Sequence, residues 1–277
     1  MKREPPSMNH LQAATIFASQ TYRLKTVPIR QPALCIVLSG TKMIHLPSGD
    51  TVTLQPKQAI LLAQHTVWDI TNQPDRDHSY QAVFVGFDAT CLQDAARSSM
   101  HLTTQPIALL QKLDHASALL EATQRLLPKQ TDHTSAHAKS TKTSTKISPE
   151  VFRHRQLEIL LLIAEAGYHF PHTTQTDWLD AIRHLVQSAP HQDWQAANLA
   201  KSLNLSESSL RRRLQNHPLT LATIVREIRL EHALHLLQTT LMPIGEVAQA
   251  CGWESHSQFS AAFQKRWGAA PSSVRAS

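Results

Sequence analysis

The stretch that decides the fold of this chain runs from Ile244 to Pro271 and reads IGEVAQACGWESHSQFSAAFQKRWGAAP. Its first residues predict a short helix ending at Ala250. Cys251-Gly252 is typical of a tight turn, because glycine adopts positive φ without strain. Ser255, followed three residues later by Gln258, has the capping-box pattern that begins a second helix. Helix, short turn and helix is the pattern of the helix-turn-helix, whose second helix enters the major groove of DNA.

The helix that follows Ser255 has two distinct faces when its residues are placed 100° apart. Phe259, Phe263 and Trp267 share one face, which we expect to be buried. The opposite face carries small and polar side chains that suit base edges, and basic side chains toward the end that suit phosphates. The predicted DNA contacts here are Ser255, His256, Ser257, Ser260, Gln264, Lys265 and Arg266.

The same pattern occurs further upstream. Asp193 is predicted to cap a helix that runs to about Leu203. The break that follows contains Asn204, a residue type that tolerates the left-handed conformation. Ser206 is the predicted cap of the next helix, and Leu210 marks its buried side. The predicted DNA contacts on the opposite side are Ser206, Ser208, Arg211, Arg212 and Gln215.

One helix is predicted between the two units, from about Leu219 to Thr239. At 1.5 Å per residue it spans about 31 Å. One turn of B-DNA is about 34 Å long. Two recognition helices held at this spacing suit successive major grooves on one face of the duplex.

The N-terminal part, from about residue 20 to residue 90, is predicted to be all β. Turn residues such as Pro47-Ser48-Gly49-Asp50 separate short runs rich in β-branched residues, and this spacing favours a sandwich or small barrel. The predicted strands are Tyr22–Val27, Leu34–Leu38, Met43–Leu46, Thr51–Leu54, Ala59–Ala63, Val67–Thr71 and Tyr80–Phe87.

Helical patterns follow the predicted strands. A helix is expected from Pro106 to about Leu127, and its apolar stripe has the 4–3 spacing of a coiled coil. That stripe is explained equally by dimerisation and by packing on the chain's own β-domain. Residues 128–149 have almost no apolar side chains, which predicts a disordered insert. A strongly apolar, buried helix is expected from Pro149 to about Gly167.

The expected domains are therefore 1–168, for sensing and dimerisation, and 174–277, for DNA binding, in an α+β protein.

Composition narrows the class of protein. Hydrophobic residues make up 42% of the chain, enough for ordinary cores, and no signal peptide or membrane-length apolar run is present, so we expect a cytoplasmic protein with no membrane partner. Cys35, Cys91 and Cys251 are too far apart in sequence to suggest a zinc site or a disulfide framework. The net charge of +6 agrees with a polyanionic partner.

At four stretches the chain resembles the AraC/XylS family of transcriptional regulators, most of all the subgroup of enteric virulence and acid-resistance regulators. The stretches are Leu199-Ala200, Ser206 to Leu214, Arg229-Leu230-Glu231 and Ile244 to Pro271. The resemblance implies an activator that binds double-stranded DNA as a homodimer and contacts RNA polymerase. It places base contacts on Ser208, Arg211, Arg212, His256, Ser257 and Ser260.

Two residues depart from the family pattern. Pro218 replaces the glycine that commonly follows the first recognition helix and comes one residue earlier, a shorter connection that is typical of the subgroup. Ala261 stands where some members carry a DNA-contacting arginine. The second unit is therefore expected to bind less tightly or to read fewer bases.

The β-domain resembles the family's cupin-like sensor, and some regulators of the subgroup hold a fatty-acid-like ligand between their domains. A carboxylate of that kind requires a basic partner, and the candidates here are Arg23, Lys25, Arg30 and Lys42. The competing interpretation, which the sequence favours slightly, is a ligand-free dimerisation platform or a dock for a regulatory protein.

The alternative to a regulator is a cupin-type small-molecule-binding or enzymatic protein with a helical assembly domain. A metal-dependent cupin needs clustered ligands, yet His45 and His65 are solitary and no glutamate lies between Glu4 and Glu121. We therefore expect no catalytic residue, metal or cofactor. His232 and His235, three residues apart on the predicted linking helix, are either ordinary surface histidines or a pH sensor.

Overall fold

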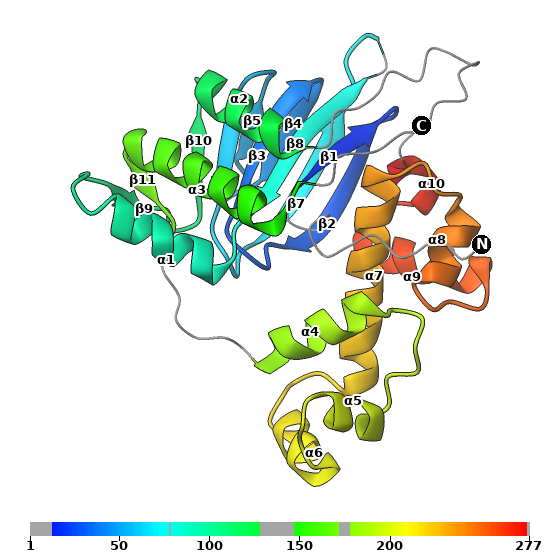
Figure 1. Cartoon of the computed structure of the whole chain (residues 1–277). Helices are drawn as coiled ribbons and strands as arrows, with labels where there is room; N and C mark the ends of the chain where they lie inside the picture. Colours follow the sequence, from blue (N-terminus) through cyan, green and yellow to red (C-terminus); the bar gives the residue numbers. More distant parts are fainter. Residues whose placement is uncertain (1–12, 78, 128–146, 172–177, 276–277) are drawn as a thin grey trace, which may run out of the picture.

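The structure, a computed structural model, describes residues 13–77, 79–127, 147–171 and 178–275. Within these ranges the N-terminal part is a β-sandwich with α1 (Ala89–Ser98), α2 (Ser117–Leu126) and α3 (Pro149–Glu165) along one side of it (Figure 1). Helices make up the part that follows. Strands followed by helices give an α+β protein, as the sequence predicts.

Two antiparallel sheets form the sandwich. Their strands are β1 (Ala13–Ala18), β2 (Tyr22–Pro28), β3 (Ala33–Ser39), β4 (Thr41–His45), β5 (Thr51–Leu54), β6 (Ala59–Leu62), β7 (Val67–Gln73), β8 (Tyr80–Gly86) and β10 (Leu110–Leu113). One sheet has the order β1-β8-β3-β6-β10 and the other β2-β7-β4-β5. All seven predicted strands are confirmed. β1 was not predicted.

The five-stranded sheet is covered on both faces, which explains the continuous apolar run of β3. Cys35 and Val37 point into the sandwich interior, whereas Leu34 and Ile36 pack against the helices. Alternate residues of a strand face opposite sides of the sheet, so a strand buried on both faces needs apolar residues at every position.

The predicted helix from Pro106 to Leu127 is wrong in its first half. β9 (Gln105–Pro106) pairs in parallel with β11 (Tyr168–His169), and β10 extends the edge of the sandwich by pairing with β6. Pairing with β10 satisfies backbone groups that β6 would otherwise leave open at the sheet edge. Only α2 is helical in this region, and its buried side, including Leu119 and Leu126, packs within the chain's own N-terminal core.

The apolar helix α3 is confirmed. Ser148 caps it, with its hydroxyl accepting from the N–H of Val151, and Pro149 occupies the first turn. Gln156, the buried polar residue of α3, donates to the backbone oxygen of Gly86 at 2.7 Å. Most of the predicted disordered insert, residues 128–146, lies outside the described residues, as do residues 172–177 of the expected linker.

The C-terminal helices are α4 (Trp178–Ser188), α5 (Ala196–Ser202), α6 (Glu207–Gln215), α7 (Leu221–Thr239), α8 (Ile244–Ala250), α9 (His256–Trp267) and α10 (Pro271–Val274). The central helix α7 has 19 residues, about 28 Å at 1.5 Å per residue. It connects α5 and α6 at one end to α8, α9 and α10 at the other, and its upper part lies beside the sandwich (Figure 1).

The two helix-turn-helix units, α5 with α6 and α8 with α9, have different cores. Ile182 of α4, together with Leu199 and Leu210 of the first unit, packs with α7 residues in a separate core. Phe259 and Phe263 of the second unit belong to the same buried cluster as Leu24 and Ile44 of the sandwich. The second unit is thus packed onto the sandwich, and the first is not.

Polar contacts join the sandwich to α7. Arg30 donates to Glu231 at 2.5 Å, and Arg183 of α4 donates to the same carboxylate at 2.6 Å. Gln238 donates to the hydroxyl of Tyr22 at 2.8 Å. In the described part of the chain, no helix has both the length and the apolar composition to cross a bilayer. No three His, Cys, Asp or Glu side chains within the same ranges are placed to hold a metal ion.

Candidate nucleic-acid interface

The first helix-turn-helix unit consists of α5 and α6. Asn204 takes the left-handed conformation in the turn, with φ of 54°, as predicted. Ser206 caps α6 by accepting from the N–H of Ser209 at 3.2 Å. The predicted start of α5 is wrong: Gln195, not Asp193, precedes its first turn. Asp193 lies two residues before that position and accepts a 2.7 Å hydrogen bond from the Gln195 side chain.

The recognition face of α6 lies opposite its buried residue, Leu210. All five predicted contacts, namely Ser206, Ser208, Arg211, Arg212 and Gln215, are exposed. Arg211 forms an ion pair with Glu207 at 2.5 Å, one helical turn away. Arg212 has no acidic partner in the described residues. The guanidinium of Arg212 is therefore available to a base or phosphate in the free protein.

The second unit consists of α8 and α9, joined by the turn at Gly252. Gly252 has φ of +77°, and a Cβ at this position would lie 2.8 Å from the backbone oxygen of Pro190. Ser255 caps α9 by accepting from the N–H of Gln258 at 3.5 Å. Phe259, Phe263 and Trp267 are fully buried, which confirms the predicted inward face.

The outward face of α9 carries most of the predicted DNA contacts. His256, Ser257, Gln264 and Lys265 are exposed, and Ser255 and Ser260 are half-buried. Ala261, the departure from the family pattern, is exposed on the same helix. Small side chains surround the exposed N-terminal end, where a recognition helix meets bases.

Arg266, a predicted phosphate contact, is held by partners within the chain. Its guanidinium bonds to Glu227 of α7, donates to the Thr26 hydroxyl at 2.9 Å and lies 4.0 Å from the centre of the Trp267 ring. Thr26 belongs to a bulge in β2 and has φ of 49°. Arg266 therefore links α9 to α7 and to the sandwich. Arg226 of α7, which is not among the predicted contacts, is exposed and lines hollows beside both units.

The four candidate effector residues do not converge. Arg23 pairs with Asp69 at 3.0 Å and Arg30 with Glu231. The exposed Lys25 packs its side-chain carbons against Gly268. Lys42 alone of the four is buried inside the sandwich.

Lys42 belongs to a buried polar row. Its Nζ donates to the Asn72 side chain at 2.8 Å and to the Tyr80 hydroxyl at 3.3 Å. Asn72 in turn donates to the Tyr22 hydroxyl at 2.7 Å, which Gln238 of α7 also reaches. Burial lowers the pKa of Lys42 and raises the pKa of Tyr22 to about 12, because both charged forms lose hydration.

A β-sandwich followed by two helix-turn-helix units on one linking helix defines a class of DNA-binding transcriptional regulators. Two family models match the chain: the AraC-type transcriptional regulator N-terminus over residues 10–139 and a helix-turn-helix domain over residues 199–277. The chain belongs to the AraC-type family of transcriptional regulators.

The curated relatives match this chain over very different lengths. The virulence regulon transcriptional activator VirF of Shigella flexneri is 34% identical over 92 residues, which are 33% of this chain and 35% of that protein. The alignment thus spans about a third of that relative's length. The urease operon transcriptional activator of Escherichia coli is 22% identical over 259 residues, covering 88% of this chain and 83% of that protein.

A solved structure resembles the whole fold. Unsaturated fatty acid-bound ToxT from Vibrio cholerae aligns with a TM-score of 0.56 and 16% identity, over 98% of this chain and 96% of that one. At this identity the likeness establishes the fold, the sandwich and the paired helix-turn-helix units together.

Proposed function

We propose that this chain is a sequence-specific DNA-binding transcriptional activator that reads two successive major grooves. The observation that carries the proposal is the pair of capped recognition helices, α6 and α9, connected by one helix of about 28 Å. Each presents polar or basic side chains to solvent and buries the opposite side. A helix of this kind fits the width of a major groove.

The side chains divide into two kinds of contact. Arg212 supplies a planar fork that pairs with guanine in the major groove, and Ser208 lies one turn before it on the exposed face. His256 and Ser257 begin α9 and are the base contacts of the second unit. Lys265, later in α9, suits a phosphate. Base contacts specify sequence, whereas phosphate contacts fix the register.

Activation, contact with RNA polymerase and homodimer formation are parts of the same proposal. Two relatives are transcriptional activators by name, those of the Shigella virulence regulon and the Escherichia coli urease operon. A dimer would couple two binding events and raise the apparent affinity for paired sites.

The test is fluorescence anisotropy of a labelled random duplex titrated with the full chain across a salt series. Because each phosphate contact releases counterions, the logarithm of affinity must fall steeply with the logarithm of salt concentration. A cupin-type protein with an assembly domain would not bind. Absent binding at low salt, or binding that salt does not weaken, contradicts the proposal.

A carboxylate effector is a second part of the proposal, favoured by Lys42. An amine held in the sandwich with only neutral partners is costly to charge, and a carboxylate beside it would offset that cost. Gln238 reaches the same polar row from α7, so a ligand there would contact both domains. The likeness to the fatty acid-bound structure supports this class of ligand.

Thermal unfolding with a panel of medium- and long-chain fatty acids tests this part. A ligand that binds the native state raises the melting temperature as its occupancy increases. We expect a rise for the natural chain and none for Lys42→Met, which keeps the volume and removes the charge. If no fatty acid shifts the melting temperature of the natural chain, and purified protein carries no lipid by mass spectrometry, the domain is a ligand-free platform.

A further inference from the structure

We propose that a cleft between α7 and α9, the Arg226 cleft, binds the phosphate backbone of the DNA that runs between the two major grooves. The cleft is defined by Arg226, Arg229, Trp253, Gln258 and Lys265. The inference rests on the proposed function, to which it adds a third point of contact on the linking helix. None of the contacts expected from the two recognition helices includes Arg226.

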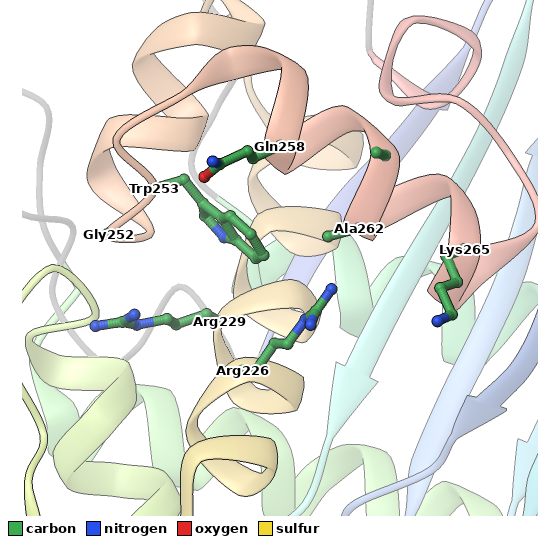
Figure 2. A pocket seen from close by; sticks show the side chains of 8 residues that line it. Arg226, Arg229, Gly252, Trp253, Gln258, Ala262 and Lys265 are labelled. Carbon is green, nitrogen blue, oxygen red and sulfur yellow. The ribbon is translucent and has the colours of Figure 1, made fainter.

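The cleft is a hollow of about 520 Å³. Figure 2 shows Arg226 entering it from α7 and Lys265 from the far end of α9, with the Trp253 ring against its wall. Gly252 lies at one end, where the turn of the second unit comes close to Arg229. The volume of the hollow is large enough for a phosphate and its sugar.

The charge of the cleft is of one sign. Three cations line it and no acidic residue does. Arg226 and Lys265 have no acidic partner within the described residues. Arg229 forms no ion pair within the described residues: it donates at 2.8 Å to the backbone oxygens of Pro190 and Gln192, and the nearby Asp193 carboxylate offsets part of its charge. Unpaired cations facing one hollow favour an anion there.

The Trp253 ring orients the Arg226 guanidinium. The Cζ of Arg226 lies 5.6 Å from the ring centre, a cation–π contact. The ring of Trp253 accepts no N–H···O hydrogen bond, so the contact leaves the N–H groups of Arg226 available to an anion. Those N–H groups form the fork that binds phosphate through two parallel hydrogen bonds. The aromatic ring thus reduces the freedom that Arg226 loses when it binds a phosphate.

The position of Arg226 indicates which anion occupies the cleft. A second hollow, beside the first unit, has Asp193, Glu207 and Arg211 in its wall and is therefore of mixed charge. Arg226 and Arg229 also line it. Arg226 therefore lies between the two units, next to surfaces that include residues of both recognition helices. If α6 and α9 occupy successive major grooves, the strand segments between them run past this part of α7. Their phosphates are the anions that the geometry supplies.

The test compares single variants of the full chain by anisotropy with a set of duplexes of roughly 30 base pairs, about three helical turns, that differ from one another at single base positions. The variants are Arg226→Ala, Lys265→Ala and Arg226→Lys. Arg97→Ala is the matched control, because Arg97 is an exposed arginine on α1, outside the cleft, whose loss changes the net charge equally. The melting temperature of each variant verifies folding.

We expect Arg226→Ala and Lys265→Ala each to reduce the magnitude of the salt slope by about 0.9, the value for one lost phosphate contact. Affinity should fall about 3- to 30-fold at fixed salt, equally for all sequences, because backbone contacts carry no sequence information. Arg226→Lys should keep the slope and lose affinity, since it retains the charge without the fork. Arg97→Ala should match the natural chain.

The outcomes separate this inference from the proposed function. If the natural chain binds with a steep salt slope while Arg226→Ala and Lys265→Ala behave as Arg97→Ala does, the cleft does not bind phosphate and the regulator proposal stands. A loss confined to one base position also overturns the inference, because it would make Arg226 a base reader. If the natural chain binds no DNA, the proposed function itself fails.

Discussion

Arg211 and Arg212 are neighbours on α6 with different electrostatic surroundings. Arg211 is paired with Glu207, whereas Arg212 is exposed and has no acidic partner among the described residues. The pair at Arg211 must open or be shared when DNA binds. An exposed ion pair of this spacing contributes only about 0.3–0.5 kcal/mol, so Arg211 remains usable at a small cost. Arg212 can bind without that cost.

Arg212→Ala should weaken specific DNA binding by about 1–3 kcal/mol and relax the preference at one base position. The reason is the loss of a bidentate contact to guanine. Competition binding with a set of single-base variants of the preferred site measures both effects. Arg211→Ala is the control on the same helix and should cost less. Unchanged affinity and unchanged preference in Arg212→Ala would remove this residue from the interface.

His232 is the histidine of α7 with an uncompensated burial cost. Its Nδ1 is buried without a hydrogen-bond partner, and burial lowers its pKa from 6.5 to about 4. Between these two pH values the unfolded chain binds a proton that the native state does not. The free energy of unfolding therefore falls as the pH is lowered below about 6.5, and the loss from this residue is complete near pH 4.

Lowering the pH from 7 to 5 should destabilise the natural chain by about 2 kcal/mol more than His232→Leu, through this histidine alone. Urea unfolding at the two pH values measures the difference. His184→Leu, a change at an exposed histidine of α4, is the control and should retain the full pH dependence. Equal pH dependence in His232→Leu and the natural chain would show that His232 protonates normally in the native state.

At the scale of elements, two glycines near α8 have opposite requirements. Gly252 in the turn has positive φ and closely approaches Pro190 and the Arg229 guanidinium, at 2.8 and 3.0 Å from a Cβ. Gly245 lies in α8 with open space around its Cβ position. Only the first is needed for the conformation of its element.

Gly252→Ala should lower stability by about 1–3 kcal/mol, because the side chain strains the backbone and meets a carbonyl. Gly245→Ala should raise stability by roughly 0.4–1 kcal/mol, because it reduces the entropy of the unfolded chain. Chemical unfolding of the two variants, followed by tryptophan fluorescence, gives both values. Gly252→Ala as stable as the natural chain would mean that the turn tolerates a Cβ and is built differently.

The sequence predicts elements well where local chemistry decides them. The turns at Asn204 and Gly252 and the cap at Ser206 follow from backbone preference and hydrogen bonding over a few residues. The segment Leu110–Leu113 was misassigned to a helix because its strand depends on pairing with β6, about fifty residues away in the chain. Propensity does not encode a distant sheet edge.

For the candidate interface too, the sequence predicts the features that depend on local structure and misses those that depend on distant contacts. Placing residues at 100° intervals was sufficient to select the exposed faces of α6 and α9. It was not sufficient for Arg266, whose partners Glu227 and Thr26 lie 39 and 240 residues away in sequence. The proposed contact Arg226 was not predicted for a related reason, since its position beside Trp253 depends on how α7 packs against the second unit.

At the scale of the whole molecule, the second unit and the sandwich share one buried cluster, and the first unit has its own. Elements that share a core open together, whereas a unit with a separate core opens at its own free energy. The domain boundary expected near residues 168–174 therefore does not coincide with a boundary between cores, because the second unit lies after it in sequence but shares a core with the sandwich.

Hydrogen exchange read by mass spectrometry should show this division. We expect amides of α9 to be protected to the same degree as those of β2 and β7, and amides of α5 and α6 to exchange sooner. The lower free energy of opening for the first unit follows from its smaller core. If α6 and α9 exchange together, and both differ from the sandwich, the two units form one body and the shared cluster is not cooperative.

The central claim is that both recognition helices read DNA from one chain. Selection of bound sequences from a random duplex library by the full chain tests it most directly. The structure predicts an enriched site with two conserved patches about 10 base pairs apart, one helical turn, and loss of one patch in Arg212→Ala. A library that shows no enrichment, or a site with a single patch that Arg212→Ala leaves unchanged, would contradict it.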